Sequence, residues 1–132
     1  MRIFLDTHVW MWWVTEDPRL SRRARSIIRK AVAGEGVWIS AISIWEMAKK
    51  VEKGALALDR PLKQWVEDAL SQPGLYVAEL SSAILIESCE LPGPFHGDPA
   101  DQIIVASARH HHALLITKDR RLHDYPNVQC RW

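Results

Sequence analysis

The chain has 132 residues, of which 48% are hydrophobic and 25% are charged. Its 17 basic and 16 acidic side chains give a formal net charge of +1, so overall charge indicates neither a nucleic-acid nor a membrane partner, and any such partner must be met by a local patch. This length supports one domain with its own core, which we expect to span residues 1–132, and is too short for two.

The first residues and the two cysteines indicate the cellular compartment of the protein. No apolar signal core follows Met1 and Arg2, and no window approaches the ~18 apolar residues of a membrane span, so we expect a soluble, cytoplasmic protein. Cys89 and Cys130 lack the spacing of a metal or redox motif. We expect buried free thiols, as in a reducing cytosol, while the sequence alone leaves a single disulfide open.

Apolar periodicity in the first half of the chain predicts strands that alternate with helices. Residues 3–5 form a short β-prone run that is typical of a strand buried on both sides in a parallel sheet. There follow a helix over about 8–14, a second helix that Ser21 caps and Gly34 stops, a buried strand over 37–39, and a third helix that ends near Gly54.

The second half continues this alternation. Pro61 fits the first position of a helix that ends at Gln72-Pro73-Gly74. There follow a strand over 75–80, a short helix from Ser81 to about Cys89, a turn-rich loop over 91–97, a helix over about 100–110, a strand over 113–116 and an apolar tail over 128–130. This order predicts an α/β fold in which helices cover both faces of a right-handed parallel sheet.

Four acidic residues fall where this topology would bring separate segments to one edge of the sheet. Asp6 follows the first strand, Glu46 lies in the first turns of the third helix, Asp101 lies in the first turn of the late helix, and Asp119 follows the strand over 113–116. Ligands of open α/β sheets collect outside the carboxyl ends of the strands. The four carboxylates are therefore candidates for one site.

Three of these acids also have a structural explanation. Asp6 could be an ordinary helix cap, and Asp119 could be a solvated charge within a basic run. Asp101 could be favoured by the helix dipole alone if Asp98 is the N-cap and Pro99 the first helical residue. Only their convergence with the other acids would distinguish a site from three local features.

The role of Glu46 depends on which serine begins its helix. If Ser43 is the N-cap, residues 43–46 form a capping box, and the carboxylate only satisfies a backbone N–H group. If Ser40 is the N-cap, Glu46 lies almost two turns into the helix and its carboxylate is free. The sequence leaves both alternatives open.

Convergence of the four acids would require a cation. Two carboxylates ~4 Å apart repel by roughly 4 kcal/mol at an effective dielectric constant near 20, which a marginally stable domain would not keep without compensation. Mg²⁺ and Mn²⁺ take oxygen ligands, and Mg²⁺ retains waters that leave room for a phosphate. The histidines lack HExxH-type spacing and the cysteines form no thiolate cluster, so we do not expect zinc.

Four phrases of the sequence resemble, in order and spacing, PIN-domain ribonucleases, specifically VapC-type toxins of bacterial toxin–antitoxin pairs. They lie at residues 5–10, 40–48, 96–106 and 115–119, and the resemblance covers essentially the whole chain. It implies a single PIN-like α/β domain with a parallel sheet and helices on both faces. The family commonly shows Asp-Pro-Phe-Asp-Arg where this chain has Asp-Pro-Ala-Asp-Gln at 98–102, a departure that retains both acids.

The resemblance implies a Mg²⁺-dependent (or Mn²⁺-dependent) endoribonuclease toxin of a type II toxin–antitoxin system, with RNA as substrate, a small antitoxin protein as partner and a homodimeric assembly. The implied catalytic and metal-binding residues are Asp6, Glu46, Asp101 and Asp119, with Asp98 as a nearby fifth acid and Thr7 and Thr117 as supporting hydroxyls. Alternatives are a PIN-fold housekeeping nuclease and a non-catalytic RNA- or protein-binding module. A HAD-type phosphatase is disfavoured because His8 stands where its Asp-x-Asp pattern needs a second Asp.

Basic residues border the predicted site from two directions. Candidate RNA contacts are Lys49 and Lys50, which follow Glu46 on its helix, and Lys118 and Arg120, which flank Asp119. A solvated helix face and a polar turn would explain them equally well. A longer basic stripe, formed by Arg22, Arg25 and Arg29, could instead pair with an acidic partner.

Seven tryptophans are unusual for this length. Trp38, Trp45 and Trp65 fit core positions, whereas Trp10, Trp12 and Trp13 cannot all point inward from one short helix. We therefore expect an exposed aromatic near the first helix, as an anchor for a second copy of the chain or an antitoxin segment. Base stacking is the weaker alternative.

Overall fold

The structure, a computed structural model, describes residues 1–132 and contains one five-stranded parallel sheet with strand order β3-β2-β1-β4-β5. In chain order the elements are β1 (Arg2–Leu5), α1 (Thr7–Val14), α2 (Arg22–Ala33), β2 (Val37–Ser40), α3 (Ala41–Glu52), α4 (Leu62–Leu70), β3 (Leu75–Ala78), α5 (Ser82–Ser88), α6 (Pro99–His110), β4 (Ala113–Ile116), α7 (Arg120–His123) and β5 (Gln129–Arg131). The predicted alternation of strands and helices is confirmed.

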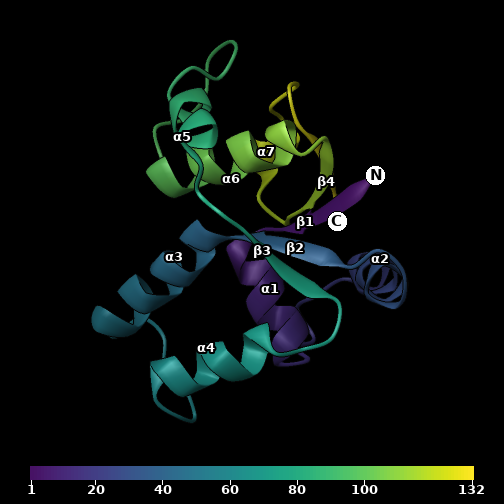
Figure 1. Cartoon of the computed structure of the whole chain (residues 1–132), viewed down its shortest axis with the longest axis vertical. Coiled ribbons are helices and arrows are strands. Elements are labelled where there is room, and N and C mark those ends of the chain that lie inside the picture. The colour runs from purple at the N-terminus through teal and green to yellow at the C-terminus, as the bar shows by residue number, and fades with distance from the viewer.

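Two hydrophobic clusters cover the two faces of the sheet. Alternate residues of β1 point to opposite faces, so Leu5 joins one cluster and Phe4 the other. The first cluster includes Trp10 and takes further side chains from α2, α3 and α4. The second is built mainly by α6, with Leu122 of α7. Figure 1 shows this division, with α1 and α4 below the sheet and α5, α6 and α7 above it.

The register of the sheet fixes where the chain presents polar residues. Leu5 pairs with Ile39 of β2 and with Ile116 of β4. The next residues, Asp6, Ser40 and Thr117, therefore emerge together at the carboxyl edge of the three central strands. Asp6 and Thr117 are buried although they lie beyond the strands, with 4% and 0% of their surface exposed.

Several sequence predictions were wrong in detail. The short helix α7 was missed, because its basic residues resemble a polar turn. Pro61 is the N-cap of α4 rather than its first residue, since its ψ of 144° is extended. Trp45 is 54% exposed rather than buried. It lies two positions from both Ser43 and Met47, which share the buried face of α3, and so points to the opposite side.

Neither cysteine takes part in a disulfide. Cys89 and Cys130 are free, but Cys89 is exposed rather than buried, because it caps the C-terminus of α5. Burial raises the pKa of the Cys130 thiol to about 12, which keeps it protonated near neutral pH. None of the helices combines the length and apolar character that crossing a bilayer requires.

Candidate active site

Asp6 connects β1 to α1 without an intervening loop. It is the N-cap of α1, and its Oδ1 accepts a hydrogen bond of 2.8 Å from the backbone N–H of Thr7. Its Oδ2 accepts a hydrogen bond of 2.6 Å from the hydroxyl of Thr117 and lies 3.5 Å from Nδ1 of His8. Capping therefore engages one oxygen of Asp6, and the other oxygen is directed toward the residue that follows β4.

Glu46 is free of any capping role. Ser40 is the N-cap of α3, where its Oγ accepts a hydrogen bond from the N–H of Ile42, so the alternative with Ser43 as the cap is wrong. The Thr7 hydroxyl donates a hydrogen bond of 2.5 Å to Oε1 of Glu46. Since that hydroxyl has one proton, the Ser43 hydroxyl, 2.8 Å away, must donate to Thr7 in turn. A relay of two hydroxyls therefore holds the Glu46 carboxylate.

Asp101 lies in the first turn of α6, where it is only 8% exposed. The side chain of Asp98 is the N-cap of this helix and accepts a hydrogen bond of 3.0 Å from the Asp101 N–H group. Oδ2 of Asp101 lies 2.7 Å from Nε2 of His96, whose ring stacks on Phe95 with centroids 4.3 Å apart. Asp98 thus supports the helix start, while His96 orients the Asp101 carboxylate.

The negative charges of these three acids influence one another's ionisation. Burial raises the pKa of Glu46, as does repulsion from Asp6 and Asp101, against a hydrogen bond from Thr7 that lowers it. Burial also raises the pKa of Asp101, and the negative charge of Asp6 adds to this effect, against the hydrogen bond from His96. Asp6, Glu46 and Asp101 therefore form a cluster of excess negative charge at the carboxyl edge of the sheet.

Asp119 lies at the rim of this cluster. It is the N-cap of α7, and its backbone N–H donates a hydrogen bond of 3.0 Å to the Thr117 hydroxyl that holds Asp6. Burial raises the pKa of Asp119, but hydrogen bonds and charge from Arg121 outweigh burial and hold it below its usual value. Nη2 of Arg121 lies 3.0 Å from Asp119 and 3.4 Å from Oδ2 of Asp101, so one guanidinium bridges the rim and the cluster.

The donor set suits a hard divalent ion that is held by one or two carboxylates and completed by water, rather than an ion enclosed entirely by protein ligands. No three side chains of His, Cys, Asp or Glu converge closely enough to enclose an ion by themselves. Mg²⁺ is usually held by one or two carboxylates, with water and substrate phosphates completing its octahedron. Buried carboxylates that repel one another supply the ligand chemistry that such an ion requires. Asp6 and Asp101 are the most buried members of the set.

The predicted basic residues divide into two groups. The charge of Lys50 lowers the pKa values of Glu46 and His8, so Lys50 lies near Glu46. The charge of Lys118 also lowers the pKa of His8, whose Nδ1 lies 3.5 Å from Oδ2 of Asp6. Lys49 turns away, with Nζ 3.0 Å from Glu52 and 5.8 Å from the centroid of the exposed Trp45 ring.

Sequence reasoning missed three supporting side chains. Ser43 was considered only as a cap, His96 was not assigned to the acids, and Arg121 was placed beside Asp119 only as one of the basic residues that border the site. An Asp followed by Arg two positions later occurs twice, at Asp17–Arg19 and Asp119–Arg121, and in both the arginine donates to that aspartate through backbone and side chain. That spacing is a signal that could have identified Arg121.

Comparison with known proteins identifies the family. A family model of the PIN domain matches residues 3–128. Ribonuclease VapC22 of Mycobacterium tuberculosis is 33% identical over 132 residues, a match that covers 98% of each chain. The chain belongs to the PIN-domain family and is of the VapC type.

Solved structures agree with this VapC-type assignment at the level of the fold. VapBC2 from Rickettsia felis, bound to a DNA fragment from its promoter, gives a TM-score of 0.74 at 19% identity and covers 99% of this chain and 98% of that one. A toxin–antitoxin complex from Klebsiella pneumoniae gives a TM-score of 0.65 at 23% identity, with 97% and 95% covered. The predicted PIN-like α/β fold is confirmed.

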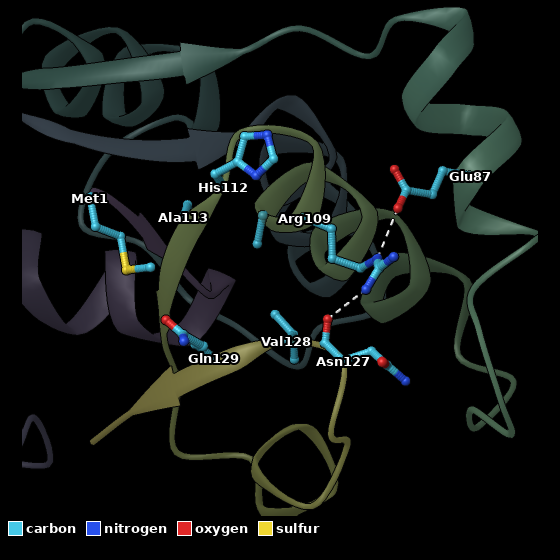
Figure 2. Close-up of a pocket in the computed structure, with 9 residues that line it drawn as sticks. Met1, Glu87, Arg109, His112, Ala113, Asn127, Val128 and Gln129 are labelled. Atoms are coloured by element: carbon cyan, nitrogen blue, oxygen red, sulfur yellow. Dashed lines mark hydrogen bonds and ion pairs between the residues drawn. The ribbon is translucent and has the colours of Figure 1, made fainter.

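The VapC-type chain has another hollow far from the acids. Figure 2 shows this pocket of about 500 Å³, where Met1, Ala113 and Gln129 mark the amino-terminal edge of the sheet. Arg109 crosses it, 2.8 Å from Glu87 and 2.7 Å from the carbonyl oxygen of Asn127. Because these partners already satisfy the one strong cation of the pocket, it offers no comparable site.

Proposed function

We propose that this VapC-type PIN domain is a metal-dependent endoribonuclease toxin that hydrolyses RNA phosphodiester bonds in the cytoplasm. The observation that carries the proposal is the cluster of Asp6, Glu46 and Asp101, which three separate elements bring to one edge of the sheet. Burial raises the pKa values of two of these carboxylates, Glu46 and Asp101, and the negative charge of Asp6 adds to both shifts. A domain that only bound a protein or RNA would not need this arrangement.

A divalent ion bound here would be Mg²⁺ or Mn²⁺, and it would activate a water and neutralise charge on the phosphate oxygens. Asp6 and Asp101 would hold the principal ion, and Glu46 and Asp119 would contribute directly or through water. The protein itself supplies orientation. Thr117 fixes Asp6, the Ser43–Thr7 relay fixes Glu46, and His96 fixes Asp101. The carboxylates would therefore act as ligands more than as proton shuttles.

Local positive charge would hold the RNA, because the net charge of +1 provides no long-range attraction. Lys50 and Lys118 are the best placed of the predicted contacts, since both influence ionisable groups of the site. Arg120 is exposed beside Asp119. Lys49 is less suited, because Glu52 already pairs with it.

We also propose a small antitoxin as partner and a homodimer as the assembled form. The antitoxin is supported by the similarity to solved toxin–antitoxin complexes. The dimer is supported by exposed apolar side chains on α5, where Leu85 and Ile86 are 41% and 59% exposed. Light scattering of the purified chain, alone and after co-expression with a candidate antitoxin, would measure both associations.

Induced expression in a bacterial host tests the function. We expect growth arrest with discrete cleavage of cellular RNA for the wild type, no arrest for Asp6→Asn, and rescue by co-expression of an adjacent small reading frame. Asp59→Asn is the matched control, because it changes an exposed acid paired with Arg60 outside the site. RNA cleavage without growth arrest would favour a housekeeping nuclease, and neither effect would favour a binding module.

A further inference from the structure

A small pocket lies at the carboxyl edge of the sheet, where β4 and β5 end. Its volume is about 290 Å³, and it is lined by Lys118, Arg120, His123, Asp124 and Trp132. Two of its lining residues flank Asp119 in the sequence, so the pocket opens next to the rim of the site. This volume lies at the lower limit of the roughly 300–1,000 Å³ typical of ligand pockets, which suits one small planar group.

Aromatic side chains join this pocket to the acids. The Trp132 ring lies 5.9 Å from Trp12 and 6.3 Å from His8, centroid to centroid. His8 in turn lies 4.9 Å from Trp12, and its Nδ1 lies 3.5 Å from Oδ2 of Asp6. The backbone N–H of Lys118 donates to Nε2 of His8 at 3.2 Å, which ties the pocket wall to this aromatic cluster.

Within the cluster, only Trp132 faces the pocket. Trp12 is engaged by cations, with Cζ of Arg19 4.8 Å and Nζ of Lys118 5.8 Å from its ring centroid. Trp132 is half-buried and packs against Trp12, and it offers the largest aromatic ring among the pocket residues, of which His123 is the other with an aromatic ring. The pocket therefore combines an aromatic wall with the cationic side chains of Lys118 and Arg120.

We propose that this pocket binds one base of a single-stranded RNA next to the bond that is cleaved, with the base stacked on Trp132. The proposal rests on the proposed function, and it extends that function by naming a substrate subsite. Aromatic side chains combined with cations are the usual means of holding single-stranded nucleic acid, because every base has a π-face and every phosphate a negative charge. A base inside an A-form helix stays stacked on its neighbours, so the substrate segment must be unpaired.

The lining favours a base over a phosphate inside the pocket. Asp124 places a carboxylate there, which would repel a phosphate but not a neutral base. The same carboxylate can accept a hydrogen bond from an exocyclic amino group. Lys118 and Arg120 would then meet the phosphates on either side of the stacked nucleotide, and their charges would direct the backbone toward Asp119.

Direct binding tests the subsite without relying on catalysis. Fluorescence anisotropy would measure the affinity of the full chain for a labelled, unstructured 12-nucleotide RNA in EDTA. We expect Trp132→Ala to weaken binding roughly tenfold, as loss of one stacked base implies, and Trp132→Phe to restore most of it. Tyr76→Ala is the matched control, because Tyr76 is an exposed aromatic on β3, at the far edge of the sheet, and its loss should leave affinity unchanged.

A second variant covers the case in which Trp132→Ala fails to fold, as thermal melting would show. Lys118→Ala changes an exposed side chain and should lower the salt dependence of binding by about one phosphate contact. Unchanged RNA affinity of a folded Trp132→Ala would overturn the subsite, as would an unchanged salt dependence of Lys118→Ala where Trp132→Ala is unfolded. In both cases RNA cleavage by the wild type would still uphold the proposed function. Loss of antitoxin binding without loss of RNA affinity would also overturn the subsite. A wild type that neither bound nor cleaved RNA would overturn both proposals.

Discussion

The hydroxyl of Thr117 donates a hydrogen bond of 2.6 Å to Oδ2 of Asp6, across 111 positions of sequence. Both residues are buried, and they follow adjacent parallel strands whose register places them side by side. The same hydroxyl accepts the N–H of Asp119. One side chain thus fixes the central acid of the site and links it to the acid at the rim.

Replacing Thr117 by valine removes the hydroxyl but keeps the shape of the side chain. Thr117→Val leaves a buried carboxylate oxygen without its donor, which should lower the free energy of unfolding by about 1–3 kcal/mol. Because partners of metal ligands affect activity strongly, we expect RNA cleavage to fall roughly 10–100-fold. Urea denaturation and a cleavage assay would measure both, with Thr117→Ser as the control that keeps the hydroxyl. Full activity in the valine variant would show that Asp6 needs no such support.

The raised pKa of Glu46 predicts a pH dependence of stability. A carboxyl group whose pKa is raised on folding binds more protons in the folded state, so its contribution to stability is lost as pH rises from its unfolded to its folded pKa. Glu46→Gln removes this loss. In EDTA, the variant should therefore gain stability relative to the wild type as pH rises above about 4. Denaturant titrations across pH would test this, and a constant difference at every pH would contradict it.

The contacts of Arg121 predict competition with a metal ion. Its guanidinium bridges Asp119 and Asp101, where it offsets negative charge that an ion would otherwise neutralise. Arg121→Ala should therefore bind Mg²⁺ more tightly, while Arg121→Lys, which keeps the charge, should stay closer to the wild type. Isothermal titration calorimetry would measure these affinities. Weaker Mg²⁺ binding by the alanine variant would mean that Arg121 supports the metal site instead of opposing it.

His96 should affect activity more than stability. Its Nε2 lies 2.7 Å from Oδ2 of Asp101, and its ring stacks on Phe95. We expect His96→Ala to reduce cleavage roughly 10-fold or more by releasing the Asp101 carboxylate. His96→Gln, which can still donate a hydrogen bond, should recover part of the activity. The comparison would be made at saturating Mg²⁺, and equal activity of both variants would exclude an orienting role.

Local patterns in the sequence predicted the strands, most helices and the convergence of Asp6, Glu46 and Asp101. They did so because strand ends and helix starts have short-range signals, and because parallel topology brings those ends to one edge. The resemblance implied Thr7 and Thr117 as supporting hydroxyls, but not which acid each hydroxyl contacts. The contacts of Thr117 and His96 depend on sheet register and on the path of a loop, which local sequence patterns do not reveal. To predict the exposure of Trp45, one must know which face of α3 is buried, and the apolar neighbours of Trp45 in the sequence do not reveal this.

Cleavage of a defined RNA by the purified protein tests the central claim most directly. With Mg²⁺ present, the wild type should produce discrete fragments, EDTA should abolish them, and added Mg²⁺ should restore them. Asp6→Asn, checked for a native melting transition, should be inactive under the same conditions, while Asp59→Asn should match the wild type. Cleavage by Asp6→Asn at the wild-type rate, or undiminished cleavage in EDTA, would contradict a metal-dependent nuclease built on this acid cluster.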